Sequence, residues 1–146
     1  METHHRCRAF KEFLETLSPS SLSALSRLVA PNIRFRDPIH DVRGIENVKR
    51  VYAGLFDIVD APRFIVTHCA CAEDVCFLRW HFTCRPRLLG KGHPWIVDAV
   101  TTLHFDAQGR VVEQFDYWDA GQYMYERFRV IGPVFRFFRK RRMRAG

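Results

Sequence analysis

The order of the periodic segments along the chain constrains the fold more than any single motif does. Apolar residues recur with helical spacing in three segments near the start, 5–17, 18–29 and 44–59. A short alternating segment, 30–38, interrupts them. Four runs rich in β-branched and aromatic residues follow, at 62–72, 75–86, 95–106 and 109–119. Because turn-like residues separate these runs, we expect a four-stranded antiparallel meander, in an α+β fold whose helices cover one face of a curved sheet.

Local signals support the boundaries of these segments. Ser18 is a good N-cap and Pro19 suits the first position of a helix, so a helix is predicted to begin there. In the short segment Ile33 and Phe35 alternate with arginines, which is typical of a strand, and Pro38 ends it.

Length and composition indicate one domain with a substantial core. The chain has 146 residues, of which 47% are hydrophobic and 14% aromatic, and this excludes a disordered polypeptide. No apolar run is long enough to predict a membrane-spanning helix. The N-terminal segment is polar rather than a signal peptide, so we predict a cytoplasmic protein.

The net charge of +7 is a property of the C-terminal tail. Residues 127–146 hold eight Lys and Arg and no acidic residue, whereas residues 1–126 are nearly neutral. We therefore divide the chain into a domain, 1–126, and a basic amphipathic tail, 127–146, and predict no nucleic-acid partner. The tail could pack its phenylalanines on the domain, lie on an anionic membrane through residues 134–144, or be an exposed end. We expect it to pack up to about residue 138.

The five cysteines do not have the spacing of a zinc site. Cys69 and Cys71 are two residues apart in a strand-like run and so share a face. We predict that the cysteines are small, buried, apolar residues, and that the chain binds no metal. The absence of a glycine-rich phosphate loop predicts no cofactor.

The stretch RFRDPIHDVRG, residues 34–44, contains the first candidate for a catalytic group. A carboxylate at the mouth of an aromatic-rich cavity loses hydration, which raises its pKa and makes it a useful general base. Asp37 fits this role, and the neighbouring His40 fits a proton shuttle or ligand contact. The alternative is that Asp37 is a turn residue bonded to backbone amides or to nearby arginines.

The last strand supplies a second carboxylate. Alternation places Gln114, Asp116 and Trp118 on one face. If Trp118 faces the cavity, Asp116 does too, and two cavity carboxylates would move each other's pKa values apart. The alternative is an Asp116 that pairs with an arginine at the rim. In the run 75–86, the face that contains Trp80 is expected to line the cavity.

The succession of two helices, FRDP, RGIENVKRVYAGL and four strands closing on TTLHFDAQGRVVEQFDYWD resembles the nuclear transport factor two-like superfamily over residues 5–125. That group includes ketosteroid isomerases and SnoaL-like polyketide cyclases. The resemblance implies a cone-shaped α+β barrel, in which a strongly curved, mainly antiparallel sheet wraps around N-terminal helices and an apolar pocket lies at the open end. It also implies a homodimer that forms through the sheet face.

The resemblance to the ketosteroid isomerases assigns roles to single residues. Asp37 matches their general base, and Tyr52 and Trp118 match residues of their pocket. Two groups stabilise the oxyanion in those enzymes, a tyrosine of the first helix and a protonated carboxylic acid. The tyrosine corresponds to Phe13 here, and the acid corresponds approximately to Thr101. Steroid isomerisation is therefore not implied, because Phe cannot donate a hydrogen bond and Thr is a weaker replacement for a neutral acid.

Two functions remain open on the sequence. The first is a cofactor-independent isomerase, cyclase, dehydratase or hydrolase that acts on a small apolar molecule. Asp37 and Asp116 would be its catalytic groups, and the expected ligand contacts are Phe13, His40, Tyr52, Trp80, Thr101 and Trp118. The second is a ligand-binding or protein-interaction module without catalytic activity, which the replaced oxyanion donors favour.

Overall fold

A computed structural model describes residues 2–87, 93–125 and 132–143. The helical elements are α1 (Glu2–Glu15), the 3-10 helix η1 (Pro19–Ala24), α2 (Leu25–Leu28), α3 (Ile45–Ile58), α4 (Ala120–Tyr123) and α5 (Gly132–Met143). The strands are β1 (Val29–Arg36), β2 (Asp41–Arg43), β3 (Val59–Ala72), β4 (Val75–Pro86), β5 (Trp95–Phe105) and β6 (Val111–Trp118). The predicted sequence of helices followed by a β-meander is confirmed.

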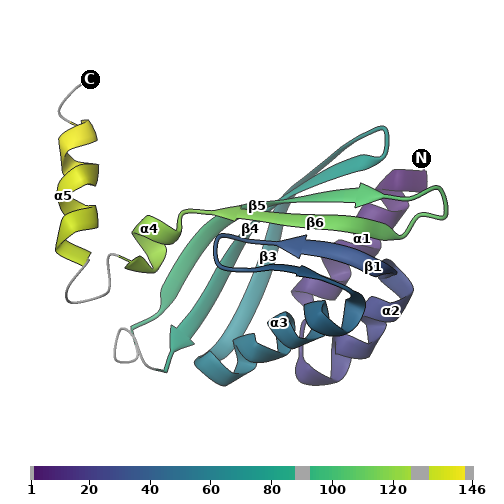
Figure 1. Cartoon of the computed structure of the whole chain (residues 1–146), viewed down its shortest axis with the longest axis horizontal. Helices are drawn as coiled ribbons and strands as arrows, with labels where there is room; N and C mark the ends of the chain where they lie inside the picture. The colour runs from purple at the N-terminus through teal and green to yellow at the C-terminus, as the bar shows by residue number, and fades with distance from the viewer. Residues whose placement is uncertain (1, 88–92, 126–131, 144–146) are drawn as a thin grey trace.

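The strands form one curled sheet in the order β2-β1-β6-β5-β4-β3. Neighbours are antiparallel except β1 and β6, which run parallel. Figure 1 shows α1, α2 and α3 together on one side of the bent sheet, which curls over them without closing. This arrangement confirms the predicted α+β cone.

The apolar face of each element meets the others between the helices and the sheet. Alternation along β4 buries Cys76, Leu78, Trp80 and Phe82 and leaves Phe77 and Arg79 outside. The largest fully buried apolar side chains in this layer come from α1, α2, β1, β4 and β5, and they are Phe10, Leu25, Ile33, Leu78 and Leu103. The predicted inner face of β4 is therefore confirmed.

Two details of the predicted elements are wrong. The second helical segment is a 3-10 helix followed by only four α-helical residues, and Val29 belongs to β1, where it pairs with Val111. The strand β2 was not expected, because three residues are too few to show an alternation. It is held by pairing with β1 and by a bidentate ion pair in which Arg34 donates to Asp41 over 2.8 and 3.0 Å.

The packing expected for the tail up to residue 138 falls partly outside the described residues, since residues 126–131 and the side chains of Phe135 and Phe138 are among those not described. Val134 and Phe137 are 52% and 57% exposed, and α5 lies beyond α4, away from the sheet (Figure 1). Contact of this helix with an anionic membrane stays a prediction. No helix among the described residues is long and apolar enough to cross a membrane.

The cap at Ser18 gives a test of how the chain enters the core. The Ser18 hydroxyl accepts from the Ser21 amide and the Ser21 hydroxyl accepts from the Ser18 amide, which forms a capping box. Ser18→Ala is expected to lower the free energy of unfolding by about 1 kcal/mol in urea denaturation. Ser26→Ala, an exposed change in α2, should stay within about 0.5 kcal/mol of the wild type. Equal stability of the two variants would contradict the role of the cap.

Candidate functional site

An apolar cavity of about 520 Å³ lies between α3 and the inner face of the sheet. Its walls are mainly aliphatic and aromatic, with Val51 and Leu55 from α3 and a group of side chains from the strands, including Phe64, Trp80, Phe82, Val97 and Trp118. Asp37, His40, Tyr52 and Asp116 also line it, so polar groups converge on an otherwise apolar space. A cavity of this size and composition suits a small organic molecule.

Asp37 is both a turn residue and a cavity residue. Its Oδ1 accepts hydrogen bonds from the backbone amides of Ile39 at 2.8 Å and His40 at 2.6 Å. The turn that these bonds hold leaves the carboxylate facing the cavity. Asp37 is thus bonded to backbone amides, as the alternative prediction has it, and it also lines the cavity.

His40 completes a pair with this carboxylate. Its Nδ1 lies 3.0 Å from Asp37 Oδ2 and 3.1 Å from Oδ1. Because an ionised carboxylate can only accept, the bond requires the proton on Nδ1, and in the neutral ring Nε2 then carries a lone pair. His40 lines the cavity and its side chain is 39% exposed. His40, which is close to Asp37 in the sequence, therefore contacts it directly.

Asp116 lies at the centre of a buried hydrogen-bond network. Trp80 Nε1 donates to Thr101 Oγ1 at 2.8 Å, and Thr101 Oγ1 donates to Asp116 Oδ1 at 2.6 Å. Gln114 Nε2 also donates to Oδ1, at 3.1 Å. Asp116 is therefore held by neutral donors, not by the arginine at the rim that was the alternative.

These surroundings change the acidity of Asp116. The pKa of Asp116 is raised from 3.8 to about 6. Burial is the largest cause, the hydrogen bonds from Thr101 and Gln114 partly oppose it, and the negative charge of Asp37 adds to it. A carboxyl group with such a pKa exchanges its proton near neutral pH, which is what acid–base chemistry requires.

Tyr52 extends the network to α3. Its hydroxyl lies 2.7 Å from Gln114 Nε2 and 3.1 Å from Oε1. Burial raises the pKa of Tyr52 well above its usual value of 10, and the charge of Asp116 adds to the effect. Tyr52 therefore remains a neutral phenol that can donate a hydrogen bond.

The remaining predicted residues have different positions. Phe13 does not line the cavity but packs edge-on behind Tyr52, with ring centroids 5.7 Å apart. Thr101 is fully buried and donates a hydrogen bond to Asp116, whereas Trp80 and Trp118 line the cavity directly. Gln114 was placed by alternation on the face of Asp116, but its role was missed. The available signal was an amide on a strand face that is otherwise buried.

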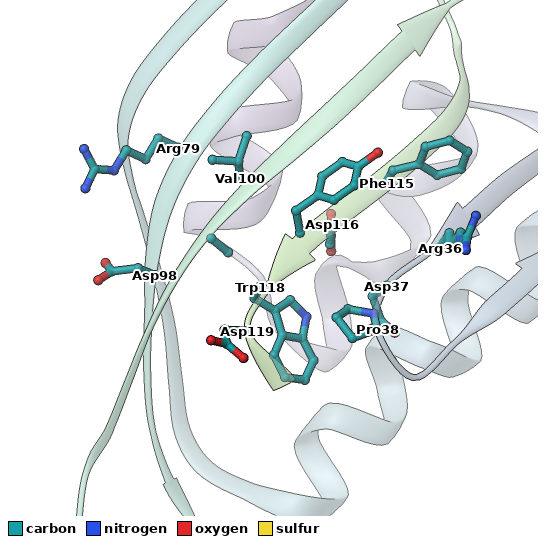
Figure 2. Close-up of a pocket in the computed structure, with 12 residues that line it drawn as sticks. Arg36, Asp37, Pro38, Arg79, Asp98, Val100, Phe115, Asp116, Trp118 and Asp119 are labelled. Atoms are coloured by element: carbon teal, nitrogen blue, oxygen red, sulfur yellow. The ribbon is translucent and has the colours of Figure 1, made fainter. Parts of the chain in front are cut away.

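A second, more open hollow of about 710 Å³ adjoins the first on the outer side of the sheet. It shares Asp37, Asp116 and Trp118 with the cavity. Figure 2 shows Trp118 close to Asp37 and Pro38 at the end of β6, while Arg79 and Asp98 project away from them. The three shared residues thus lie where the apolar cavity reaches the outside.

The cavity carboxylates do not form a metal site. In the part of the chain that the structure describes, the one group of three or more potential ligands that are close enough to share an ion is Cys7, Cys71 and Cys76. That group is at a different place in the fold.

Comparisons with known proteins agree with this architecture. Residues 10–114 match the profile of the SnoaL-like domain. No curated protein matches the sequence.

Three solved structures show the same fold at low identity. A proposed SnoaL-like polyketide cyclase from Jannaschia sp. has a TM-score of 0.73 at 16% identity, over 84% of this chain and 89% of that one. A protein from Catenulispora acidiphila with a ketosteroid isomerase-like fold, in complex with trimethylamine, has a TM-score of 0.68 at 15% identity, with 82% and 88% covered. An LEH-like epoxide hydrolase from M. tuberculosis has a TM-score of 0.68 at 14% identity, with 84% and 89% covered.

The raised pKa of Asp116 gives stability a specific pH dependence. Because the folded pKa of about 6 lies above 3.8, the folded state binds this proton more tightly. The resulting stabilisation is fully present below about pH 4 and is lost as the pH rises through about 6. Asp116→Asn is expected to remove this component, so that the unfolding free energy in urea falls less steeply over that window.

A surface carboxylate provides the matched control. Asp57 is exposed on α3, and Asp57→Asn should keep the wild-type slope of stability against pH. If the wild type and Asp116→Asn have the same slope, Asp116 does not hold a proton more tightly in the folded state.

Proposed function

Since the chain belongs to the SnoaL-like domain family, we propose that it is a cofactor-independent acid–base enzyme that acts on a small apolar molecule. Isomerisation, cyclisation, dehydration and hydrolysis are the reactions in this class. The proposal rests on one observation: two carboxylates in different surroundings line the same apolar cavity.

The two carboxylates differ in what they contact. Asp37 is bonded to backbone amides and to His40, while Asp116 is bonded to side chains in a buried network. In the proposed reaction the Asp37–His40 pair accepts the proton, either on the carboxylate or on His40 Nε2. Asp116 gives or holds a proton at a neighbouring atom of the substrate, since its pKa of about 6 permits both states near neutral pH.

The apolar walls bind and orient the rest of the substrate. Trp80, Phe64 and Trp118 provide flat surfaces, and Leu55 narrows the cavity on the side of α3. Holding the reacting carbon near the carboxylates reduces the entropy cost of the reaction, and exclusion of water strengthens the charge interactions. The reactions in the names of the cyclase and epoxide hydrolase neighbours belong to the same class.

A ligand-binding module without catalysis is the second candidate. Two observations favour it. The Thr101 hydroxyl already accepts a hydrogen bond from Trp80 and donates one to Asp116, and Phe13 packs behind Tyr52. Neither residue offers a donor to a negative oxygen that develops in the cavity. An enzyme would have to use Tyr52 or protonated Asp116 as the donor, and the Tyr52 hydroxyl would first have to leave Gln114.

A proton-exchange assay with a panel of small compounds tests the proposed enzyme. Apolar cyclic ketones and epoxides are incubated with the protein in D2O, and deuterium uptake next to the carbonyl or diol formation is followed. At least one compound is expected to react faster than in buffer. Asp37→Asn and Asp116→Asn should each reduce that rate by about 10² to 10⁴-fold.

Two further variants are controls, one on the surface and one in the cavity wall. Asp57→Asn, on the surface, should retain the wild-type rate. Leu55→Trp, which enlarges a side chain on the cavity wall, should weaken binding, measured by tryptophan fluorescence, and reduce turnover with it. If compounds bind in the cavity but none reacts faster than in buffer, the second candidate function replaces the first.

We also propose a homodimer through the outer face of the sheet. Exposed apolar side chains from four neighbouring strands gather there: Ile65, Phe77, Ile96, Val100 and Tyr117. Arg79, His81 and Asp98 lie among them on the same face, and a mixture of exposed apolar and polar side chains of this kind suits a protein interface. A second copy of the chain would cover this face.

The dimer can be tested by sedimentation velocity. Ile96→Asp is expected to convert the dimer into a monomer, because it would bury a charge in the interface. Val134→Asp, which changes another exposed apolar residue, on α5, should leave the dimer intact. A wild-type protein that sediments as a monomer at micromolar concentration would rule out this assembly.

A further inference from the structure

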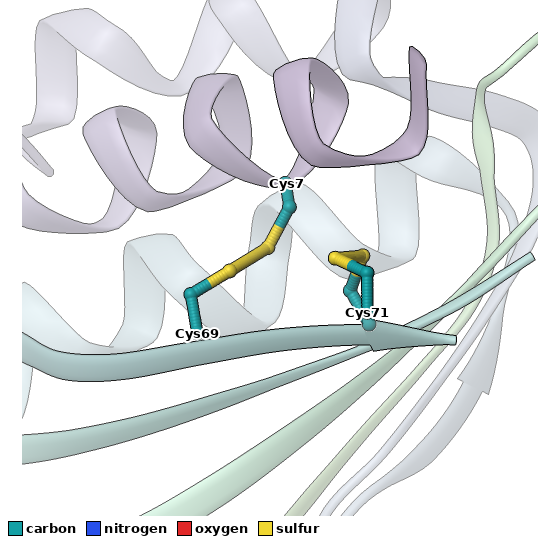
Figure 3. Close-up of a disulfide and its surroundings, with 4 residues drawn as sticks. Cys7, Cys69 and Cys71 are labelled. Atoms are coloured by element: carbon teal, nitrogen blue, oxygen red, sulfur yellow. A yellow bond between two sulfur atoms is a disulfide. The ribbon is translucent and has the colours of Figure 1, made fainter. Parts of the chain in front are cut away.

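Four of the five cysteines meet at one place between α1 and the hairpin of β3 and β4. The structure joins Cys7 to Cys69 and Cys71 to Cys76 as disulfides. Figure 3 shows the sulfur atoms in the layer between α1 and β3. Cys7, Cys76 and Cys84 are buried as predicted, whereas Cys71 is half-buried and Cys69 is exposed. The two disulfides were not predicted.

The hairpin explains why the cysteines converge. Glu73 and Asp74 form a tight turn, with Glu73 at a φ of 55°, so Cys71 and Cys76 stand directly opposite each other. Their Cα atoms are 4.1 Å apart. Cys69, two residues before Cys71, points to the same face, and α1 brings Cys7 over that face from 62 residues away.

The sulfur atoms form a single group rather than two separate pairs. Those of Cys7, Cys71 and Cys76 all lie within 4.8 Å of one another, and Cys69 is bonded to Cys7. Four thiolates around a zinc ion, with Zn–S bonds of about 2.3 Å, are separated by about 3.8 Å. To surround an ion, the sulfur atoms of each disulfide have to separate to that distance, and Cys69, which lies outside the group of three, has to turn toward the others.

The backbone separation agrees with an ion as well. The Cα atoms of Cys7 and Cys69 are 7.5 Å apart, whereas disulfides usually span about 4.4 to 6.8 Å. Two thiolates that share a metal ion are not directly bonded and so suit a wider Cα separation. Cys7 and Cys76 are fully buried, which provides a closed environment, and the exposed Cys69 leaves one side open for entry.

We propose that Cys7, Cys69, Cys71 and Cys76 bind one soft divalent cation of the Zn²⁺ type when they are reduced. The two disulfides are then the oxidised, metal-free form of the same site. Four thiolates and no open position are the composition of a structural zinc site. In a reducing compartment such as the predicted cytoplasm, disulfides are rare and clustered cysteines more often hold a metal.

The conversion between the two forms balances with a phosphine as reductant. Each disulfide reacts with one phosphine and one water to give two thiols and one phosphine oxide. Two disulfides therefore give four thiols, which release their protons when Zn²⁺ binds. Once the bond to Cys7 is open, rotation about the Cα–Cβ bond of Cys69 brings its sulfur to the fourth corner of the site.

Metal content of the full chain provides the first test. Protein reduced with a phosphine and equilibrated with Zn²⁺ under argon is expected to retain one Zn²⁺ per chain after gel filtration. Protein kept oxidised should retain none. Co²⁺ in place of Zn²⁺ should give thiolate-to-cobalt charge-transfer absorption, which is specific for sulfur ligands. Reduced wild-type protein that retains no zinc would overturn the proposal.

Cysteine variants assign the ligands. Cys71→Ser is expected to bind Zn²⁺ at least about 100-fold more weakly, because loss of a ligand costs more than the 10- to 100-fold loss seen for outer partners. Cys84→Ser is the matched control, since Cys84 is buried outside both disulfides and should not affect zinc. Equal affinity of the two variants would contradict the assignment.

A second readout covers the case in which Cys71→Ser fails to fold. The melting temperature of the reduced wild type should rise when Zn²⁺ is added and stay constant with Mg²⁺, which thiolates bind poorly. A melting temperature that does not respond to Zn²⁺ would also overturn the proposal.

Discussion

In the six-stranded sheet, β1 runs parallel to β6, and Arg36 of β1 lies opposite Phe115 of β6. Asp37 directly follows the last residue of β1, and Asp116 follows Phe115 within β6. This register therefore brings the two aspartates to the same end of the cavity, although they are 79 positions apart in the chain. Parallel neighbours need a long crossover, and here α3 and the meander provide it. The same segments enclose the cavity. The pairing of β1 with β6 therefore determines both where the carboxylates are and what surrounds them.

A network of hydrogen bonds offsets the free energy lost when Asp116 is buried, and every described donor in this network is neutral. Removing a carboxylate from water is unfavourable, and it is tolerated only when hydrogen bonds replace the lost hydration. Thr101 and Gln114 supply these bonds, and they are in turn bonded to Trp80 and Tyr52. The proton affinity of Asp116 consequently stays high, whereas an ion pair with an arginine would have lowered it.

The sequence predicted what depends on periodicity and missed what depends on distant contacts. The inner face of β4 and the shared face of Gln114, Asp116 and Trp118 follow from alternation, because a strand side chain has only two directions to take. The strand β2 depends on its pairing with β1, and its three residues, 41–43, have no pattern that would predict a strand. The network around Asp116 joins residues from α3, β4, β5 and β6, so spacing along one segment could not reveal it. The convergence of Cys7 with the hairpin cysteines was missed for the same reason.

Helix α1 connects the two sites that the sequence left separate. Cys7 lies on this helix at the cysteine group, and Phe13 lies two turns later, where it packs against Tyr52 behind the cavity. A link between Cys7 and Cys69 closes a loop of 62 residues, which in the chain-entropy treatment stabilises the fold by about 4 kcal/mol. Cys7 and Phe13 are both residues of α1, and both are buried against the sheet side of the helix. The state of the cysteines and the packing behind Tyr52 are therefore properties of one element of the fold.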